Sequence, residues 1–197
     1  MAAWGGIYRD TWGLGPSTSK YPGSFPRGLL PRMKRKNWWG SERLWMFSGG
    51  FKDPAGTTVD INPKVRPDVV ADCESLPFDD ESFDFVMLDP PYSELEARQL
   101  YNLDYCNIFK VINEAARVTR PGGCMAVLHR LAPWHAPLEI EHKKRMQPVA
   151  VVGVYTIAGY VNMRALTVWR KRETMHRFES QLELTIQEPA GIPEAVL

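Results

Sequence analysis

The residues with the clearest chemical potential form one short segment, Asp89-Pro90-Pro91-Tyr92. An amino group on an aromatic ring is a weak nucleophile because its lone pair is delocalised into the ring. The Asp89 carboxylate and the Pro90 carbonyl can accept hydrogen bonds from such a group, and consecutive prolines stiffen the backbone that carries them. Tyr92 can stack on the ring. The segment therefore predicts chemistry on a planar amine, with a surface turn as the simpler alternative.

Upstream, polar residues or glycines close each of four predicted strands. The strands and the residues that close them are 43–47 with Gly49 and Gly50, 57–61 with Asp60, 68–71 with Asp72, and 83–88 with Asp89. In mostly parallel α/β sheets, ligands bind at the carboxyl ends of the strands. We therefore expect these side chains to meet at one edge of a sheet.

The rest of the chain continues the α/β alternation. The further elements that its periodicity predicts are a short helix around 27–36, a helix over about 104–118, a strand at 124–128, a hairpin of 150–157 with 163–169, and a short strand at 181–186. We divide the chain into an irregular basic and aromatic arm (1–40), a core (41–178) and a tail (179–197). The arm tryptophans are expected to anchor it to the core rather than to stack on bases.

Residues 72–92 carry the pattern D-x-x-x-L-P-F-x-D-x-S-F-D-x-V, followed by D-P-P-Y. Together with the strand-end residues, this segment resembles class I S-adenosylmethionine-dependent methyltransferases. Within that group it resembles the N6-adenine and N4-cytosine amino-methyltransferases of nucleic acids. The resemblance implies a Rossmann-like, seven-stranded, mostly parallel sheet that ends in an antiparallel hairpin.

The resemblance also implies S-adenosylmethionine as cofactor, no metal, and two sets of site residues. The catalytic set is Asp89, Pro90, Pro91 and Tyr92, and the cofactor set is Phe47, Gly49, Gly50, Asp60, Asp72 and Cys73. Asp60 corresponds to an acid that binds the ribose, and Asp72 with Cys73 to residues beside the adenine. The glycine loop departs from the family pattern, with Trp45 near the usual acid and Phe51 where a glycine might stand. A purely structural glycine turn is therefore an open alternative there.

The function implied is methyl transfer to an exocyclic amino group of a base, first of all N6 of adenine in DNA or RNA. The alternatives are methylation of a small molecule or a protein, and a non-catalytic subunit with the same fold. These 197 residues hold no separate target-recognition region. We therefore expect phosphate contacts from the basic arm and from Lys143–Arg145, a homodimer, or a partner subunit.

Composition adds little about the partner. The net charge is +1, but residues 1–52 are basic and residues 53–104 are rich in Asp and Glu. The three cysteines, which have no CxxC spacing, predict neither a zinc site nor a disulfide framework. The sequence shows neither a signal peptide nor an apolar run of the roughly 20 residues that span a bilayer, so we expect no membrane association and a cytoplasmic location.

Overall fold

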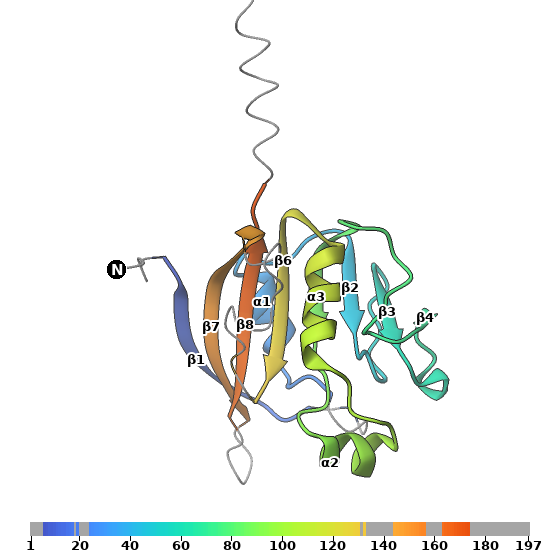
Figure 1. Cartoon of the computed structure of the whole chain (residues 1–197). Coiled ribbons are helices and arrows are strands. Elements are labelled where there is room, and N and C mark those ends of the chain that lie inside the picture. Colours follow the sequence, from blue (N-terminus) through green and yellow to red (C-terminus); the bar gives the residue numbers. More distant parts are fainter. Residues whose placement is uncertain are drawn as a thin grey trace, which may run out of the picture.

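The computed structural model describes residues 6–17, 19, 24–130, 132, 144–156 and 163–173. These residues form one eight-stranded sheet with the order β1-β7-β8-β6-β5-β2-β3-β4 (Figure 1). The strands are β1 (Tyr8–Leu14), β2 (Arg43–Met46), β3 (Gly56–Asp60), β4 (Val69–Val70), β5 (Phe83–Leu88), β6 (Thr119–His129), β7 (Met146–Thr156) and β8 (Arg164–Lys171). The helical segments are α1 (Leu29–Lys34), η1 (Pro63–Val65), α2 (Glu94–Glu96), η2 (Ala97–Tyr101) and α3 (Ile108–Val118).

The centre of the sheet is parallel. Strand β2 pairs in parallel with β3 and β5, β3 with β4, and β5 with β6. Strand β8 is antiparallel to both of its neighbours, β6 and β7. The α/β, Rossmann-like, mostly parallel sheet with a C-terminal antiparallel hairpin is thus confirmed.

The strand count is eight, whereas we expected seven. The additional strand, β1, comes from the arm that we expected to be irregular, and it pairs in parallel with β7. Only Trp12 and Leu14 of this strand are buried, so its alternation of apolar and polar residues is short. Glycines and prolines, which are typical of turns, surround this segment, so its short alternation does not predict a strand.

The sheet is buried on both faces because side chains alternate along each strand. In β5, Val86 and Leu88 pack with the apolar side of α3, whereas Phe85 and Met87 pack with the arm and α1. Figure 1 shows α3 in front of the sheet and α1 behind it. Trp12 and Trp38 belong to the second cluster, which confirms their expected anchoring role; Trp4 lies outside the described residues.

Helix α3 is fixed at both ends by side chains. Asn107 caps its start by accepting hydrogen bonds from the N–H groups of Phe109 and Lys110. At its end the buried Lys171 donates to the carbonyls of Ala116 and Thr119, at 2.9 and 2.8 Å. No helix in the described part of the chain is long and apolar enough to cross a membrane.

Candidate active site

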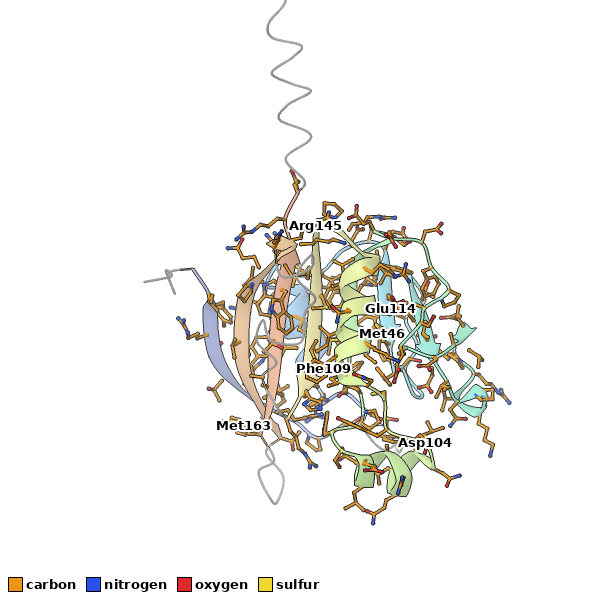
Figure 2. The ribbon with its side chains drawn as sticks, in the orientation of Figure 1. Met46, Asp104, Phe109, Glu114, Arg145 and Met163 are labelled. Atoms are coloured by element: carbon orange, nitrogen blue, oxygen red, sulfur yellow. The ribbon has the colours of Figure 1, made fainter. Side chains whose placement is uncertain are left out.

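A cavity of about 690 Å³ lies beyond the carboxyl ends of β2, β3 and β5. Eight of the ten predicted site residues line it: Phe47, Gly49, Gly50, Asp60, Asp72, Cys73, Asp89 and Pro91. Asp104, which also lines the cavity, appears in Figure 2 close to α2 at this end of the sheet. The meeting of strand-end residues that the sequence predicted is therefore present.

The glycine loop after β2 is shaped by backbone geometry and by a carboxylate from the next strand. Phe47 and Gly49 both have positive φ, at 57° and 51°. The N–H of Gly49 donates to Asp60 Oδ2 at 2.8 Å, and the N–H of Asn62 donates to Asp60 Oδ1 at 2.9 Å. The buried Asp60 side chain thus ties the end of β3 to the loop while facing the cavity.

The two aromatic departures from the family pattern have packing roles. Trp45 is buried, and its indole N–H donates to Asp53 Oδ2 at 2.9 Å. Its ring centroid lies 4.7 Å from that of Phe51, and Phe51 contacts Phe25 edge-on at 5.4 Å. Phe25 and Phe51 both line the cavity, so this aromatic group forms one of its walls.

One polar group in the cavity lining was not predicted. The hydroxyl of Ser48 is buried and has no hydrogen-bond partner among the described residues. A buried hydroxyl without a partner is costly unless a ligand completes its hydrogen bonding. Its position between Phe47 and Gly49 makes it an available polar group of the cavity, which the sequence pattern alone could not distinguish from a turn residue.

Asp72 and Cys73 follow β4 at the cavity wall. Asp72 accepts a hydrogen bond from the N–H of Glu74 at 2.8 Å, so it stabilises a turn and also borders the cavity. Cys73 is buried, and this burial strongly raises the pKa of its thiol. Cys73 therefore provides a neutral, apolar contact beside the Asp72 carboxylate.

The segment after β5 is organised by a chain of side-chain hydrogen bonds. The hydroxyl of Tyr92 donates to Asp89 Oδ1 at 2.8 Å, and Arg164 Nη1 donates to that hydroxyl at 3.0 Å. Arg164 is the first residue of β8, and Figure 2 shows the preceding Met163 at the same end of the sheet as Asp104. The guanidinium group is 72 residues distant in sequence from Tyr92, so no local motif could reveal it.

These contacts set the charge state of Asp89. Burial raises the pKa of its carboxyl to about 7, although the Arg164 charge and the Tyr92 hydrogen bond lower it and the Glu96 charge raises it further. No described residue donates a hydrogen bond to Asp89 Oδ2. The side chain is therefore a cavity-facing proton acceptor that titrates close to neutrality.

Tyr92 and Pro90 differ from their expected positions, because neither lines the cavity. The ring of Tyr92 contacts His129 edge-on at 5.3 Å, and the Arg130 guanidinium lies 5.4 Å from its centroid. In this packing the Tyr92 hydroxyl contacts Asp89, and stacking of the ring on a substrate stays a prediction. Pro90 is buried, and Pro91 borders the cavity.

The segment from α2 to residue 106 forms a further wall that we did not predict. Tyr101, Leu103, Tyr105 and Cys106 line the cavity from this side. A capping signal, Ser93-x-x-Glu96, stands at its start: the Ser93 hydroxyl accepts from the N–H of Glu96 at 3.2 Å. That signal could have located α2, although not the π-helical turn η2 that follows it.

Comparison with known proteins agrees with this architecture. Residues 54–127 match the family described as "Methyltransferase domain". The structure titled "Conversion of a Disulfide Bond into a Thioacetal Group during Echinomycin Biosynthesis" has a TM-score of 0.54 at 14% identity, over 81% of this chain and 88% of that chain. The [4+2]-cyclase SpnF has a TM-score of 0.52 at 16% identity, over 82% and 88%.

A third solved structure is 1,6-didemethyltoxoflavin-N1-methyltransferase of Burkholderia thailandensis. It has a TM-score of 0.49 at 12% identity, over 73% of this chain and 76% of that chain. No curated protein matches the sequence. The family match thus covers the central part of the sheet, from β3 into β6, and the two structures with TM-scores above 0.5 share the fold of the chain.

Proposed function

We propose that the chain is an S-adenosylmethionine-dependent methyltransferase that acts on an exocyclic amino group of a nucleic-acid base, first of all N6 of adenine in DNA or RNA. The observation that carries the proposal is the state of Asp89 at the cavity. Tyr92 holds one of its carboxylate oxygens at 2.8 Å, and no described residue donates to the other. The free oxygen is an acceptor with a fixed position, as an aromatic amine requires.

The residues of the cavity fit the cofactor. Gly49 and Gly50 allow its close approach to the backbone, and the unpartnered Ser48 hydroxyl offers a hydrogen bond. Asp60 would face the ribose, and Asp72 with Cys73 the adenine. When bound, S-adenosylmethionine supplies an electrophilic methyl group.

The chain's own contribution to the chemistry centres on Asp89. Its Oδ2 accepts an N–H of the substrate amine, which localises the nitrogen lone pair on the side away from the carboxylate. The amine loses one proton in the reaction, and a carboxylate with a pKa of about 7 can hold that proton at neutral pH. Tyr92 and Arg164 keep the carboxylate oriented through the hydrogen bonds described above.

A small molecule is the second candidate substrate. The cavity wall is rich in apolar and aromatic side chains, among them Phe25, Leu30, Tyr101 and Leu103. Its volume of about 690 Å³ lies within the range of small-ligand pockets. A flipped base and a free heteroaromatic amine would make the same contact with Asp89. The two substrates differ in the phosphates that a nucleic acid carries outside the cavity.

Two measurements test the proposal. Calorimetry with S-adenosylmethionine and with its demethylated product should show binding, and its absence would contradict the enzymatic function. Transfer of a labelled methyl group should then be measured on duplex DNA, single-stranded DNA, structured RNA and small aromatic amines. We expect label in nucleic acid, and label confined to the small amines would establish the second candidate instead. A homodimer or a partner subunit that contributes target recognition belongs to the same proposal.

A further inference from the structure

The basic residues near α3 and β6 are largely neutralised by carboxylates. Arg117 pairs with Glu114 at 2.8 Å and with Asp80 at 2.9 Å. Arg120 pairs with Asp84 at 3.2 Å. These cations stabilise the fold, and because carboxylates compensate their positive charge they attract an anionic partner only weakly.

The arm differs in its charge pattern. Five basic residues, which we call the arm surface, lie on α1 and beside its ends: Arg27, Arg32, Lys34, Arg35 and Lys36. No Asp or Glu occurs between Asp10 and Glu42. None of the five side chains forms an ion pair with a carboxylate of the described residues. Basic residues in the last turn favour a helix through its dipole, but that accounts only for Arg32 and Lys34.

Aromatic rings hold two of these cations in place. Lys36 Nζ lies 3.9 Å from the centroid of the Tyr8 ring, and the Arg32 guanidinium lies 5.8 Å from that of Trp12. A cation over a ring keeps its N–H donors available, whereas a carboxylate would occupy them. The arm surface is therefore an ordered group of donors whose acidic neighbour is Asp10, which attracts Lys36 without forming an ion pair with it.

The arm surface begins at the cavity. Arg27, Gly28, Leu30 and Pro31 line the cavity, and α1 continues from them. A helical rise of 1.5 Å per residue places Lys36 within roughly 12 Å of Gly28. A nucleic-acid strand carries several phosphates over such a length.

We infer that the arm surface binds the phosphate backbone of the nucleic acid whose base enters the cavity. The inference rests on the proposed function, and it names the surface that would distinguish a nucleic acid from a free amine. Several phosphates on one strand can each contact a cation of the arm surface, and such contacts position the substrate without reading its sequence.

The composition of α1 favours a nucleic acid over an anionic membrane. Helices that lie on membranes bury an apolar face in the lipid. The apolar residues Leu29 and Met33 of α1 are fully buried against the sheet, so the helix has no such face for lipid. The second basic segment that we considered, Lys143–Arg145, is less suitable, because Arg145 pairs with Glu81 at 2.7 Å; Lys143 lies outside the described residues.

The test compares two triple variants that remove the same charge. Lys34→Gln/Arg35→Gln/Lys36→Gln removes three exposed cations from the arm surface, and Lys64→Gln/Arg66→Gln/Arg172→Gln removes three exposed cations elsewhere. Binding of fluorescent duplex DNA, single-stranded DNA and an RNA hairpin is followed by anisotropy over a salt series. Thermal unfolding and calorimetry with S-adenosylmethionine check that both variants fold and bind cofactor. Methyl transfer to the same nucleic acids is measured in parallel.

We expect the arm variant to bind nucleic acid about tenfold or more weakly than the wild type. On duplex DNA, the plot of log K against log salt should become less steep, by about 0.9 for each phosphate that the variant no longer neutralises. The control should bind like the wild type. The inference would be overturned if the arm variant kept the affinity and slope of the wild type, or if both variants lost affinity equally. It would also be overturned if the wild type bound vesicles of anionic lipid but not nucleic acid. Methylated nucleic acid with unaltered binding by the arm variant would refute the inference alone. Arm-dependent binding without methylation of any nucleic acid would refute the proposed function alone.

Discussion

Two loops at the carboxyl ends of neighbouring parallel strands are built on different principles. The loop after β2 takes its shape from backbone geometry, with positive φ at Phe47 and Gly49 and one carboxylate, Asp60, that accepts backbone N–H groups. The loop after β5 takes its properties from side chains: Tyr92 donates a hydrogen bond to Asp89, and Arg164 donates one to Tyr92.

Under the proposed function, this difference separates the loop that binds the cofactor from the loop that acts on the substrate. A loop held by backbone geometry tolerates altered side chains, which is why Phe51 can stand where the family pattern has a glycine. A loop whose key group titrates near neutrality depends on the identity of every residue that contacts this group. Substitutions that disturb the backbone of the loop after β2 should therefore alter cofactor affinity, and substitutions after β5 should alter turnover and its pH dependence.

The largest effect is expected at Asp89. Asp89→Ala should lower methyl transfer about 10²- to 10⁴-fold, because it removes the acceptor of the amine proton. Cofactor affinity, measured by calorimetry, should stay within about threefold of wild type, since the carboxylate acts on the substrate amine. The exposed Asp79→Ala is the matched control. A parallel loss of cofactor binding in Asp89→Ala would place Asp89 with the cofactor loop and remove the distinction between the loops.

Asp60→Ala should give the next largest effect, on binding. The substitution leaves the N–H groups of Gly49 and Asn62 without their acceptor, which should lower the free energy of unfolding by about 1–3 kcal/mol. Loss of the loop shape should weaken cofactor binding about tenfold or more, with kcat at saturating cofactor largely retained.

Asp68→Ala is the control for that variant. Asp68, just before β4, accepts hydrogen bonds from the N–H and hydroxyl of Thr58 in β3, outside the cavity lining. The Asp68→Ala variant should be less stable than the wild type but should keep its cofactor affinity. Equal losses of affinity in both variants would mean that general destabilisation, rather than the glycine loop, controls binding.

Tyr92→Phe should move the pH dependence of turnover. The rate should rise with pH as Asp89 deprotonates and level off above about 7. The Tyr92 hydrogen bond and the Arg164 charge both lower the pKa of Asp89, so removing either raises this pKa and shifts the rising limb to higher pH. Just below neutral pH the rate of Tyr92→Phe should fall about three- to tenfold, with recovery at alkaline pH.

Arg164→Gln should shift the limb in the same direction, and the exposed Arg98→Gln should not shift it. An unchanged pH profile in both Tyr92→Phe and Arg164→Gln would show that the charge of Asp89 does not limit the rate. A shift in only one of them would assign the effect to that contact alone.

The smallest effect is expected for Phe47→Gly, which places a glycine at a positive φ. Glycine relieves backbone strain of the order of 1 kcal/mol, but the half-buried phenyl ring loses its packing against the core. We expect these terms to offset within about 1 kcal/mol in the free energy of unfolding and cofactor affinity to change by less than about threefold. A loss of more than tenfold in affinity would show that the ring itself contacts the cofactor.

The sequence predicts the central strands well for physical reasons. The run 83–88 is buried on both faces and bounded by polar residues, so its predicted and observed limits coincide. Helix α3 begins at Ile108 rather than near residue 104, because Asn107 supplies the cap. The predicted strand at 181–186 lies outside the described residues.

The candidate site was only partly predictable. Residues that directly follow strands could be placed at one edge of the sheet, since parallel strands bring their carboxyl ends together. Contacts from distant elements could not: Arg164 reaches Tyr92 from β8, and the orphan hydroxyl of Ser48 is recognisable only from its surroundings. The contacts of Tyr92 could not be predicted for the same reason, because its partners His129 and Arg130 belong to β6 and the turn that follows it.

The most direct test of the central claim is to identify the methylated atom. Nucleic acid incubated with S-adenosylmethionine and the wild-type protein is digested to nucleosides and analysed by mass spectrometry, alongside a reaction with Asp89→Ala. We predict a base methylated on its exocyclic amino group, N6-methyladenine first of all, and we predict that this product is lost with Asp89→Ala. Methylation at a ring nitrogen, a carbon or a ribose oxygen, or an amino-methylated base that persists in Asp89→Ala, would contradict it.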